Sequence, residues 1–357
     1  MQKAARFHGN QDLRIDSVEI PPVAAGEVRV KIAFAGICGS DLHEYFGGPM
    51  TCRAAGCPHP LTGETVPATL GHEFSGTITE VGEDVDENKL RVGSRVCIEP
   101  IISCLECRSC LAGNRPLCEK GIGFFGYNRP GGLASYANIT QANCHVVPDS
   151  VPLDVAALAE PLSVAWHAVR VSGFKEGEAA LVVGAGPIGA MVTRVLKARG
   201  ASWIGVSEPT ETRARIAQTC GADAVFNPMK VDVVEEVRKA TGGGVHVAID
   251  CAGNQRTFDA CINSTRAKGK IVMVALWEKP AQIDLQAILF GEKIVTASCC
   301  FEGQDMKETL EALESGLVKV DDLITSKIKL EDVVAKGLLA LKTEEHHVKI
   351  LVDMSYS

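Results

Sequence analysis

Four cysteines crowd into one short stretch of the sequence, "CLECRSCLAGNRPLC", which covers residues 104–118. In a cytosolic protein, the setting expected below, such a tight cluster favours metal binding over disulfide bonds. Four thiolates complete the tetrahedral coordination of Zn²⁺ and leave no position for water or a substrate. We therefore predict a structural zinc site whose ligands are Cys104, Cys107, Cys110 and Cys118.

A metal ion that takes part in a reaction needs an open coordination position, so its ligands are expected to be mixed and to lie elsewhere in the chain. A thiolate, an imidazole and a carboxylate would hold a second zinc ion and leave room for an alcohol oxygen, whose pKa the metal lowers. A serine hydroxyl and a second histidine could then pass a proton towards solvent. Taken singly, each residue has an ordinary packing role as its alternative. The candidates are Cys38, Ser40 and His43 in "GICGSDLH", His72 and Glu73 in "LGHEFSG", and Glu160 in "LAEPLSVAWHA".

A glycine-rich turn, "LVVGAGPIGA", follows an apolar run and begins an amphipathic helical pattern. Glycines at this spacing permit a tight turn and let backbone N–H groups and the helix N-terminus approach a pyrophosphate. The setting between a strand and a helix makes this stronger evidence than the glycines alone. The predicted cofactor-binding residues of the turn are Gly184, Gly186, Pro187, Ile188 and Gly189.

An acidic residue near the end of the next predicted strand, Glu208, indicates which dinucleotide binds. Its carboxylate could accept hydrogen bonds from the ribose hydroxyls and would repel a 2′-phosphate, which favours NAD over NADP. Arg213 could instead help to hold a phosphate, so NADP stays open as the alternative. Ser207 could share the ribose contact.

The elements that must position these residues are of two kinds. Before about residue 150, short runs such as "EVRVKI", with Val28, Val30 and Ile32 on one side, alternate with period 2 and predict strands of a partly closed barrel. After "ALAEPLSVAWHAV", six apolar runs alternate with helical segments, which predicts a doubly wound parallel sheet of buried strands. The tail from about residue 293 is expected to return to the first domain.

The chain is thus predicted to be an α/β protein of two domains. The β-barrel domain is expected over residues 1–155 and 293–357, and the cofactor domain over 156–292. A length of 357 residues agrees with more than one core.

Composition excludes other classes of protein. The formal net charge is −8, with no basic run, which argues against binding of nucleic acid. No apolar stretch approaches the roughly 20 residues that span a bilayer. Because the N-terminal sequence has neither a secretory nor a transit-peptide pattern, we expect a cytoplasmic protein without membrane partners.

The order and spacing of these motifs resemble the zinc-dependent medium-chain dehydrogenases/reductases over essentially the whole chain. The resemblance rests on "CGSDLH", "GHEFSG", the four-cysteine loop, "EPLSVAWHA" and "GAGPIG". It implies a GroES-like β-barrel catalytic domain, a Rossmann NAD-binding domain, one catalytic and one structural zinc, and a homodimer or homotetramer.

The same resemblance implies roles for single residues. Cys38 and His72 would be ligands of the catalytic zinc, and Ser40 and His43 would match the proton relay of the family. At the position of Glu160 the alcohol dehydrogenase branch has a cysteine. The glutamate in this chain resembles the polyol dehydrogenase branch instead. In that branch two glutamates can exchange roles, so two candidates for the third ligand remain open, Glu73 and Glu160.

The long stretch between the first two ligands, "DLHEY…GP…HPLTG…TLGHEFSG", resembles the 2,3-butanediol (acetoin) dehydrogenases. This implies NAD-dependent interconversion of a vicinal diol and an α-hydroxy ketone. The alternatives are a sorbitol- or xylitol-type polyol dehydrogenase and, from another class, a non-catalytic NAD-sensing or structural relative. The insert also contains Cys52, Cys57 and His59, for which an ordinary loop is favoured over a further metal site.

Overall fold

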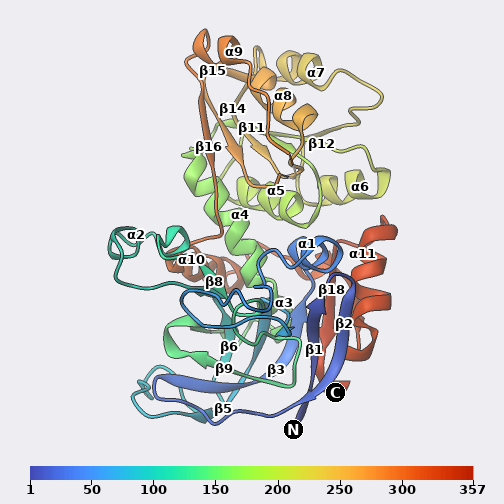
Figure 1. Ribbon diagram of the computed structural model, residues 1–357. Coiled ribbons are helices and arrows are strands. Elements are labelled where there is room, and N and C mark those ends of the chain that lie inside the picture. Colours follow the sequence, from blue (N-terminus) through green and yellow to red (C-terminus); the bar gives the residue numbers. More distant parts are fainter. Residues whose placement is uncertain (278, 357) are drawn as a thin grey trace. The chain divides into compact units, whose positions relative to one another are not determined.

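The computed structural model describes residues 1–277 and 279–356 and divides into two compact units (Figure 1). Unit 1 comprises Met1–Glu160 and Glu302–Ser357, and unit 2 comprises Pro161–Phe301. The division differs from the predicted boundaries, above all in the return of the chain to unit 1. The return comes after residue 301 instead of 292, because the sixth strand of the parallel sheet, residues 294–297, belongs to unit 2.

A seven-stranded sheet forms the centre of unit 1. Its strands follow the order β10-β6-β5-β3-β18-β17, and β9 also pairs with β3. All pairs are antiparallel except β17 with β18. The strands are β3 (Glu27–Gly36), β5 (Glu73–Val81), β6 (Arg95–Ile98), β9 (Tyr136–Thr140), β10 (Cys144–Val146), β17 (Ile324–Ile328) and β18 (Lys349–Asp353).

The predicted alternation of β3 is confirmed, since Val28, Val30 and Ile32 are buried in the core of unit 1 whereas Lys31 is exposed. The predicted return of the tail is also confirmed. The last strand, β18, is red in Figure 1 and pairs with the blue strand β3. The C-terminal segment therefore completes the sheet that begins at the N-terminal end of the chain.

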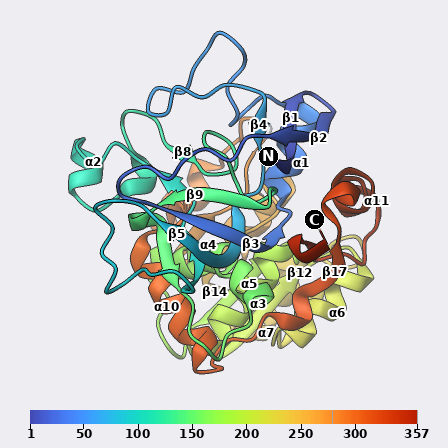
Figure 2. The same cartoon turned by 90° about the horizontal axis from the view of Figure 1, so that it is seen from below.

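Two smaller sheets and several short helices complete unit 1. The strands β2-β1-β4 form one sheet, whose first two members lie side by side in Figure 2, and β7 pairs with β8. The strands are β1 (Gln2–Gly9), β2 (Asp12–Val18), β4 (Ala68–Thr69), β7 (Ile101–Ile102) and β8 (Gly123–Phe124). The α-helices are α1 (Gly39–Gly47), α2 (Arg108–Leu111), α3 (Leu153–Ala157), α10 (Gly303–Glu314) and α11 (Leu339–Thr343). The 3₁₀ and π turns are η1 (Arg115–Leu117), η2 (Gln141–Asn143), η3 (Asp321–Leu323), η4 (Leu330–Asp332), η5 (Val333–Leu338) and η6 (Met354–Tyr356).

Unit 2 is built on a six-stranded parallel sheet of order β13-β12-β11-β14-β15-β16. This is the strand order of the Rossmann fold, as predicted. The strands are β11 (Ala179–Val183), β12 (Trp203–Ser207), β13 (Ala224–Phe226), β14 (Val245–Asp250), β15 (Thr265–Met273) and β16 (Ile294–Ala297). The helices are α5 (Pro187–Ala198), α6 (Glu211–Thr219), α7 (Val233–Thr241), α8 (Gln255–Ser264) and α9 (Leu285–Leu289), and α4 (Ala159–Ser172) crosses the boundary between the units.

Local sequence explains these elements well. Strand β11 is an unbroken apolar run and is buried throughout, as a central parallel strand must be. Helix α7 is capped at its N-terminus by Asp232, whose side chain accepts two backbone hydrogen bonds, and at its C-terminus by Gly242, which has φ +67°. The expectation that all six strands are buried is wrong for β16, since Ile294 and Val295 are largely exposed at the edge of the sheet. In residues 1–277 and 279–356, no helix combines the length and apolar character required to cross a membrane.

Candidate functional site

The structure gathers the four-cysteine loop into one cluster. The ligand atoms of Cys104, Cys107, Cys110 and Cys118 all lie within 4.8 Å of one another. The Cys107 sulfur accepts hydrogen bonds from the backbone N–H groups of Cys110 and Glu119, which lowers the pKa of the Cys107 thiol to about 6. Burial raises the pKa of Cys110 to about 11. Thiolates supported by backbone amides are suited to a closed zinc site.

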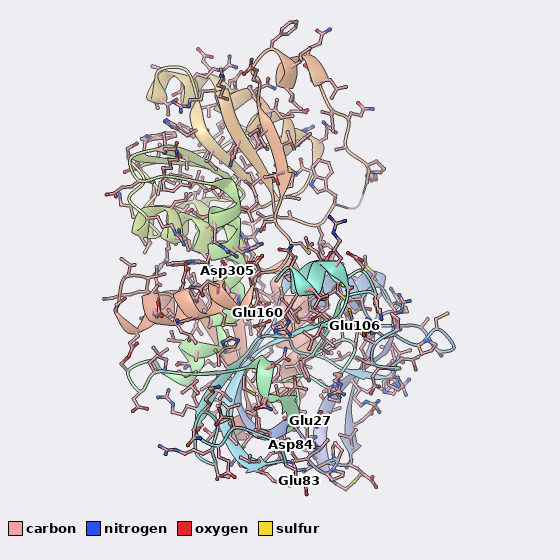
Figure 3. All side chains as sticks on the ribbon, turned by 90° about the vertical axis from the view of Figure 1, so that its left-hand side faces the viewer. Glu27, Glu83, Asp84, Glu106, Glu160 and Asp305 are labelled. Carbon is pink, nitrogen blue, oxygen red and sulfur yellow. The ribbon has the colours of Figure 1, made fainter. Side chains whose placement is uncertain are left out.

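The loop is attached to the sheet of unit 1 through Arg115. Its guanidinium lies 3.0 Å from the buried carboxylate of Glu99 and donates to the carbonyl of Ile101 at 3.1 Å. The other oxygen of Glu99 lies 3.0 Å from His145 Nε2. Ordering of the loop is thereby linked to the end of β6. Figure 3 labels another carboxylate of the same loop, Glu106, which pairs with Lys120 on the exposed side.

Strand pairing brings the second set of predicted ligands together. In the antiparallel pair β3–β5, Gly36 lies opposite Glu73. Cys38 and His72 therefore leave the same edge of the sheet, and their ligand atoms and that of Glu73 lie within 4.8 Å of one another. Gly36 is needed here because a Cβ at that position would lie 2.1 Å from Glu73 Oε2.

A lysine that no sequence pattern indicated faces these ligands. Lys349, the first residue of β18, is 1% exposed, and its Nζ donates to both oxygens of Glu73 at 2.7 Å and to the carbonyl of Ile37 at 3.2 Å. Burial alone would lower the pKa of Lys349, but the charge of Glu73 and other acidic groups raises it above the ordinary value. Lys349 therefore carries a positive charge against Glu73.

A second residue that the sequence did not indicate, Tyr127, joins the helix that carries Ser40. Its hydroxyl lies 2.9 Å from Asp41 Oδ1 and 3.0 Å from Ser40 Oγ, and its ring lies 5.1 Å from that of His72. Asp41 also accepts a hydrogen bond from the backbone N–H of Cys38 at 2.9 Å, which fixes the start of α1. Ser40 is thus held by its surroundings beside the predicted metal ligands.

The histidine of this group is strongly affected by its neighbours. His72 is buried, with Nε2 3.4 Å from Ser40 Oγ and Nδ1 3.5 Å from Asp41 Oδ1. Burial would lower the pKa of His72, but the charge of Asp41 raises it well above the ordinary value. His43 is exposed one helical turn after Ser40 on α1, and within the described residues no hydrogen bond joins the two side chains.

Glu160 lies in the first turn of α4 and is labelled in Figure 3. Its carboxyl is buried, which raises its pKa to about 8. The charge of His72 opposes this rise, and that of Glu73 adds to it. Glu160 is therefore close enough to both for electrostatic interaction, as the prediction of a shared site requires.

These side chains fit a divalent cation. A thiol, an imidazole and a carboxylate are gathered at ligand spacing, and further buried carboxylates lie around them. Lys349 faces one carboxylate, and the raised pKa of His72 means that a proton on the imidazole supplies a second positive charge, which a metal ion would supply instead. The raised pKa of Glu160 reflects the cost of burying its charge. The acidic members of the cluster are Asp41, Glu73 and Glu160.

The predicted glycine turn has the geometry of a pyrophosphate site. Gly184 has φ +94°, and Gly186 precedes α5, with Pro187 as its first residue. Gly189 must lack a side chain because a Cβ there would lie 1.8 Å from the carbonyl oxygen of Gly184. A Cβ at Gly186 would meet no protein atom within 4 Å, so the protein itself does not require this glycine, and the open space suits a close approach by phosphate. Ile188, next to Gly189, is half-buried.

The carboxylate of Glu208 belongs to the same turn. One oxygen accepts a hydrogen bond from the backbone N–H of Ala185 at 2.8 Å, and the other accepts from Thr210 at 2.9 Å. Glu208 is buried, and each oxygen has a further lone pair for a ligand hydroxyl. Arg213 is half-buried on α6, and Ser207 is buried at the end of β12.

The insert residues do not form a metal cluster in the described part of the chain. His59 is buried, its Nδ1 accepts from the backbone N–H of Leu61 at 3.3 Å, and its Nε2 lies 3.1 Å from the carbonyl of Ile122. Both ring nitrogens therefore have backbone partners. Cys52 is buried, which raises the pKa of its thiol, whereas Cys57 is exposed.

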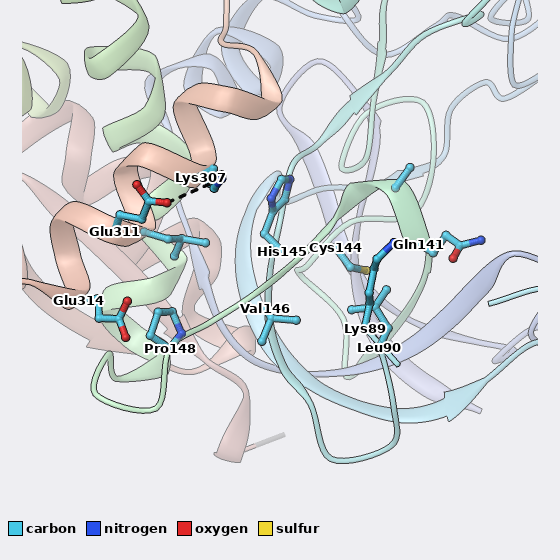
Figure 4. Close-up of a pocket in the computed structure, with 12 residues that line it drawn as sticks. Lys89, Leu90, Gln141, Cys144, His145, Val146, Pro148, Lys307, Glu311 and Glu314 are labelled. Carbon is cyan, nitrogen blue, oxygen red and sulfur yellow. Dashed lines mark ion pairs between the residues drawn. The ribbon is translucent and has the colours of Figure 1, made fainter. Parts of the chain in front are cut away.

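A separate pocket of about 630 Å³ lies in unit 1 between α10 and the segments around Lys89 and His145 (Figure 4). Its charged residues are mainly exposed, and Lys307 pairs with Glu311 across one turn of α10. None of the predicted site residues lines this pocket. This pocket therefore does not coincide with the candidate metal centre.

Comparison with known proteins identifies the class of protein that this fold and site define. Residues 24–149 match the alcohol dehydrogenase GroES-like domain, and residues 187–315 match the zinc-binding dehydrogenase domain. The chain belongs to the zinc-dependent medium-chain alcohol dehydrogenases, and it is an enzyme. The predicted family and fold class are confirmed, and the hypothesis of a non-catalytic relative is not supported.

Individual proteins similar to this chain indicate a narrower group within the family. The (R,R)-butanediol dehydrogenase of Neisseria gonorrhoeae is 39% identical over 98% of this chain and 99% of its own length. That of Bacillus subtilis is 40% identical over 98% and 99%. The crystal structure of 2R,3R-butanediol dehydrogenase from Bacillus subtilis covers 99% of each chain with a TM-score of 0.93. The predicted resemblance to butanediol dehydrogenases is thus confirmed.

Other matches bear on the alternatives. A sorbitol dehydrogenase of Bacillus subtilis is 31% identical over 98% of this chain and 96% of its own length. Two solved structures that cover 99% of each chain at a TM-score of 0.89 contain dinucleotides. An alcohol dehydrogenase from E. coli, 28% identical, holds NADH, and a zinc-binding dehydrogenase from Sinorhizobium meliloti, 29% identical, holds NADP. Structures similar to this chain thus contain either dinucleotide.

Proposed function

We propose that the enzyme interconverts 2,3-butanediol and acetoin, a vicinal diol and its α-hydroxy ketone, with NAD as the hydride carrier. The observation that carries this proposal is the juxtaposition of Cys38, His72 and Glu73 in a chain that is 40% identical to a butanediol dehydrogenase over nearly its full length. The sorbitol relative is less similar, at 31% identity. A vicinal diol offers a second hydroxyl, and a site that binds both would discriminate against simple alcohols.

We propose that Cys38 and His72 hold the catalytic zinc together with a carboxylate. Two observations separate the candidates for that carboxylate. Glu73 lies at ligand spacing but has both oxygens engaged by Lys349, whereas no ion pair involving Glu160 is found among the described residues. Glu160 lies outside the group of ligand atoms found within 4.8 Å of one another, so its carboxylate has to approach the metal to complete the ligand set, and Glu73 is the group that can exchange with it. When bound, zinc supplies a Lewis acid that favours loss of the alcohol proton.

The proton path starts at Ser40. A phenol has one proton and an ionised carboxylate can only accept, so the Tyr127 hydroxyl donates to Asp41 and Ser40 donates to the Tyr127 oxygen. The backbone N–H of Cys38 and the Tyr127 hydroxyl both donate to Asp41, and these hydrogen bonds favour its ionised form. The lone pairs of Ser40 Oγ then remain available to accept the substrate proton, and the exposed His43 exchanges it with water.

Replacement of Tyr127 by phenylalanine tests this arrangement. The variant removes the hydroxyl donor of Asp41 Oδ1 and the acceptor of Ser40, so we expect kcat/KM to fall about ten-fold and the solvent deuterium isotope effect to increase. Zinc content should not change. Tyr136→Phe, a half-buried tyrosine on β9, is the control. An unchanged isotope effect in Tyr127→Phe would show that Tyr127 does not orient the relay.

Glu208 supports the choice of NAD, since a buried carboxylate beside the glycine turn would repel a 2′-phosphate. In Glu208→Gln the amide oxygen can still accept from Ala185, but the charge is lost. We expect the ratio of kcat/KM for NAD over NADP to fall about ten-fold or more. Glu211→Gln, exposed at the start of α6, should leave the ratio unchanged. An unchanged ratio in both variants would contradict the assignment.

We propose that a second copy of the chain covers the edge of the parallel sheet. Strand β16 ends the sheet and exposes Ile294 and Val295, and the nearby Leu289 and Phe290 are 69% and 83% exposed. An exposed apolar edge strand is a ready surface for association between subunits. The choice between a homodimer and a homotetramer follows from the mass in solution.

Charge at this edge should therefore separate the subunits. We expect Phe290→Glu to shift the mass measured by light scattering towards one chain at micromolar concentration, because a carboxylate would be buried in the interface. Leu317→Glu changes an exposed leucine on the other unit and should leave the mass unchanged. A mass that is the same for Phe290→Glu and the unmodified enzyme would place the interface elsewhere.

We propose that the enzyme works in the cytoplasm on small molecules. The four-cysteine loop needs thiolates, and a reducing compartment preserves them. The negative net charge gives no support for binding to nucleic acid.

The substrate assignment is tested by initial rates of NAD reduction with (R,R)-, (S,S)- and meso-2,3-butanediol, sorbitol and xylitol, with NADP in parallel. We expect stereoselective oxidation of butanediol with NAD by enzyme that contains about two zinc ions per chain. Strong sorbitol turnover with weak butanediol turnover would retain the zinc site and replace the substrate. Absence of turnover with every alcohol at full zinc content would overturn the proposal.

A further inference from the structure

Two adjacent cysteines follow the last strand of unit 2. Cys299 is exposed and Cys300 is half-buried, and their sulfur atoms lie 3.8 Å apart. Cys300 has φ +52°, in the left-handed region that residues with a side chain seldom adopt. The pair lies in the non-helical segment just before the chain passes from Phe301 to Glu302 into unit 1. Neither cysteine belongs to the metal sites described above.

The electrostatic setting makes one thiol of the pair the stronger nucleophile. A hydrogen bond from Cys300 lowers the pKa of Cys299 to about 6, with burial opposing and the charge of His167 assisting. By contrast, burial raises the pKa of Cys97 to about 12 and that of Cys261 well above the ordinary value. At neutral pH, Cys299 is therefore mainly a thiolate with a second thiol beside it, which is the arrangement of an attacking and a resolving cysteine.

We propose that Cys299 and Cys300 form a reversible thiol–disulfide site that reacts with small-molecule disulfides. The Cys299 thiolate attacks one sulfur of the small disulfide, forms a mixed disulfide and releases one small thiolate. Cys300 then attacks the Cys299 sulfur, forms the bond between the adjacent cysteines and releases the second small thiolate. Two protein sulfurs are oxidised and one small disulfide is reduced to two thiols, of which one takes its proton from Cys300 and the other from water, because Cys299 enters as a thiolate.

Chain geometry makes this disulfide reversible rather than structural. The Cα atoms of adjacent residues are about 3.8 Å apart across a trans peptide, shorter than the range of about 4.4–6.8 Å found for most disulfides. A disulfide between neighbours is therefore strained, and strained, exposed disulfides are the easily reduced, regulatory ones. The pair would thus respond to the thiol–disulfide balance of its surroundings.

The test uses the full-length, zinc-loaded enzyme equilibrated with mixtures of reduced and oxidised glutathione, followed by acid quenching, alkylation and trypsin digestion. The tryptic peptide of residues 294–307 contains Cys299 and Cys300 and no other cysteine. We expect the doubly alkylated peptide to be replaced by an unalkylated one, two hydrogen atoms lighter than the free dithiol, as the oxidised fraction rises, and to return after treatment with dithiothreitol. A peptide that stays in the dithiol form, or that carries only glutathione, would overturn the proposal.

Single variants test the order of the steps. Cys300→Ser should accumulate the mixed disulfide on Cys299, because no resolving thiol is present. Cys299→Ser cannot form the disulfide between the adjacent residues, and it should form a mixed disulfide on Cys300 more slowly than Cys300→Ser forms one on Cys299. At pH 6, Cys299 should be alkylated about ten-fold faster than Cys57, an exposed cysteine in unit 1 that is the matched reference. Equal reaction of Cys299→Ser and the unmodified enzyme with oxidised glutathione would contradict the attacking role of Cys299.

Discussion

Replacement of Cys38 by serine is expected to remove one zinc ion per chain and to lower kcat/KM for diol oxidation by about 10³-fold or more. Cys38 supplies the thiolate of a ligand set gathered within 4.8 Å, and a serine hydroxyl is a poor substitute for it. Charge stabilisation by a metal is worth several kcal/mol, and each 1.36 kcal/mol is a factor of ten in rate. Zinc per chain by elemental analysis and initial rates with NAD provide the measurement.

A matched control separates metal loss from the loss of a cysteine. Cys57→Ser removes an exposed cysteine of the same unit and should retain about two zinc ions per chain and full activity. If Cys38→Ser kept both zinc ions and more than about a tenth of the activity, Cys38 would not be a ligand of the reactive metal. Retention of one zinc ion with loss of activity would show that the two sites are independent.

The parts of the site that the sequence could predict are those in which neighbouring residues carry the signal. The glycine turn can be recognised from one short stretch of sequence, because the strand, the glycines and the helix follow one another directly. The structure confirms the turn, in which Gly189 lies close to the carbonyl oxygen of Gly184. The four-cysteine loop is equally local. For Cys38 and His72, the motifs named the residues, but the strand register that places them together, Gly36 opposite Glu73, could not be derived from the sequence.

The residues that the sequence did not reveal reach the site through long-range packing. Lys349 lies 276 positions after Glu73, and only the pairing of β18 with β3 brings it there. Tyr127 lies 87 positions after Ser40 in an irregular turn whose path no periodicity encodes. A buried lysine and a buried tyrosine have no distinctive spacing, so each looks like an ordinary strand or loop residue until the fold is known.

The edge strand β16 shows a different limit. Its apolar sequence predicted a buried strand, and the pairing with β15 is as expected, but its side chains are exposed in the single chain. An apolar sequence pattern predicts that a surface is buried, but it does not distinguish burial within the chain from burial against another chain. The 83% exposure of Phe290 beside this strand is one observation behind the intersubunit contact proposed above.

Replacement of Cys118 by serine is expected to reduce zinc from about two ions to about one per chain and to lower the apparent Tm by about 10 °C. Cys118 is buried in the four-cysteine cluster, and the loop it closes carries Arg115, whose ion pair with Glu99 ends in the core of unit 1. Loss of the metal disorders the loop and leaves Glu99 buried without that cation, which costs a few kcal/mol. Thermal unfolding and elemental analysis provide the measurement.

Unlike Cys38→Ser, Cys118→Ser should keep most of its catalytic activity. Molecules of Cys118→Ser that stay folded keep the reactive site, so kcat/KM at low temperature should remain within about ten-fold of the unmodified enzyme. Ser109→Ala lies in the same loop, where its hydroxyl bonds Glu119 on the surface, and it should keep both zinc ions and its Tm. Loss of activity in Cys118→Ser equal to that in Cys38→Ser, at unchanged Tm, would mean that the cluster takes part in the reaction. An unchanged zinc content would mean that Cys118 is not a ligand, because a closed four-sulfur site has no other donor to replace it.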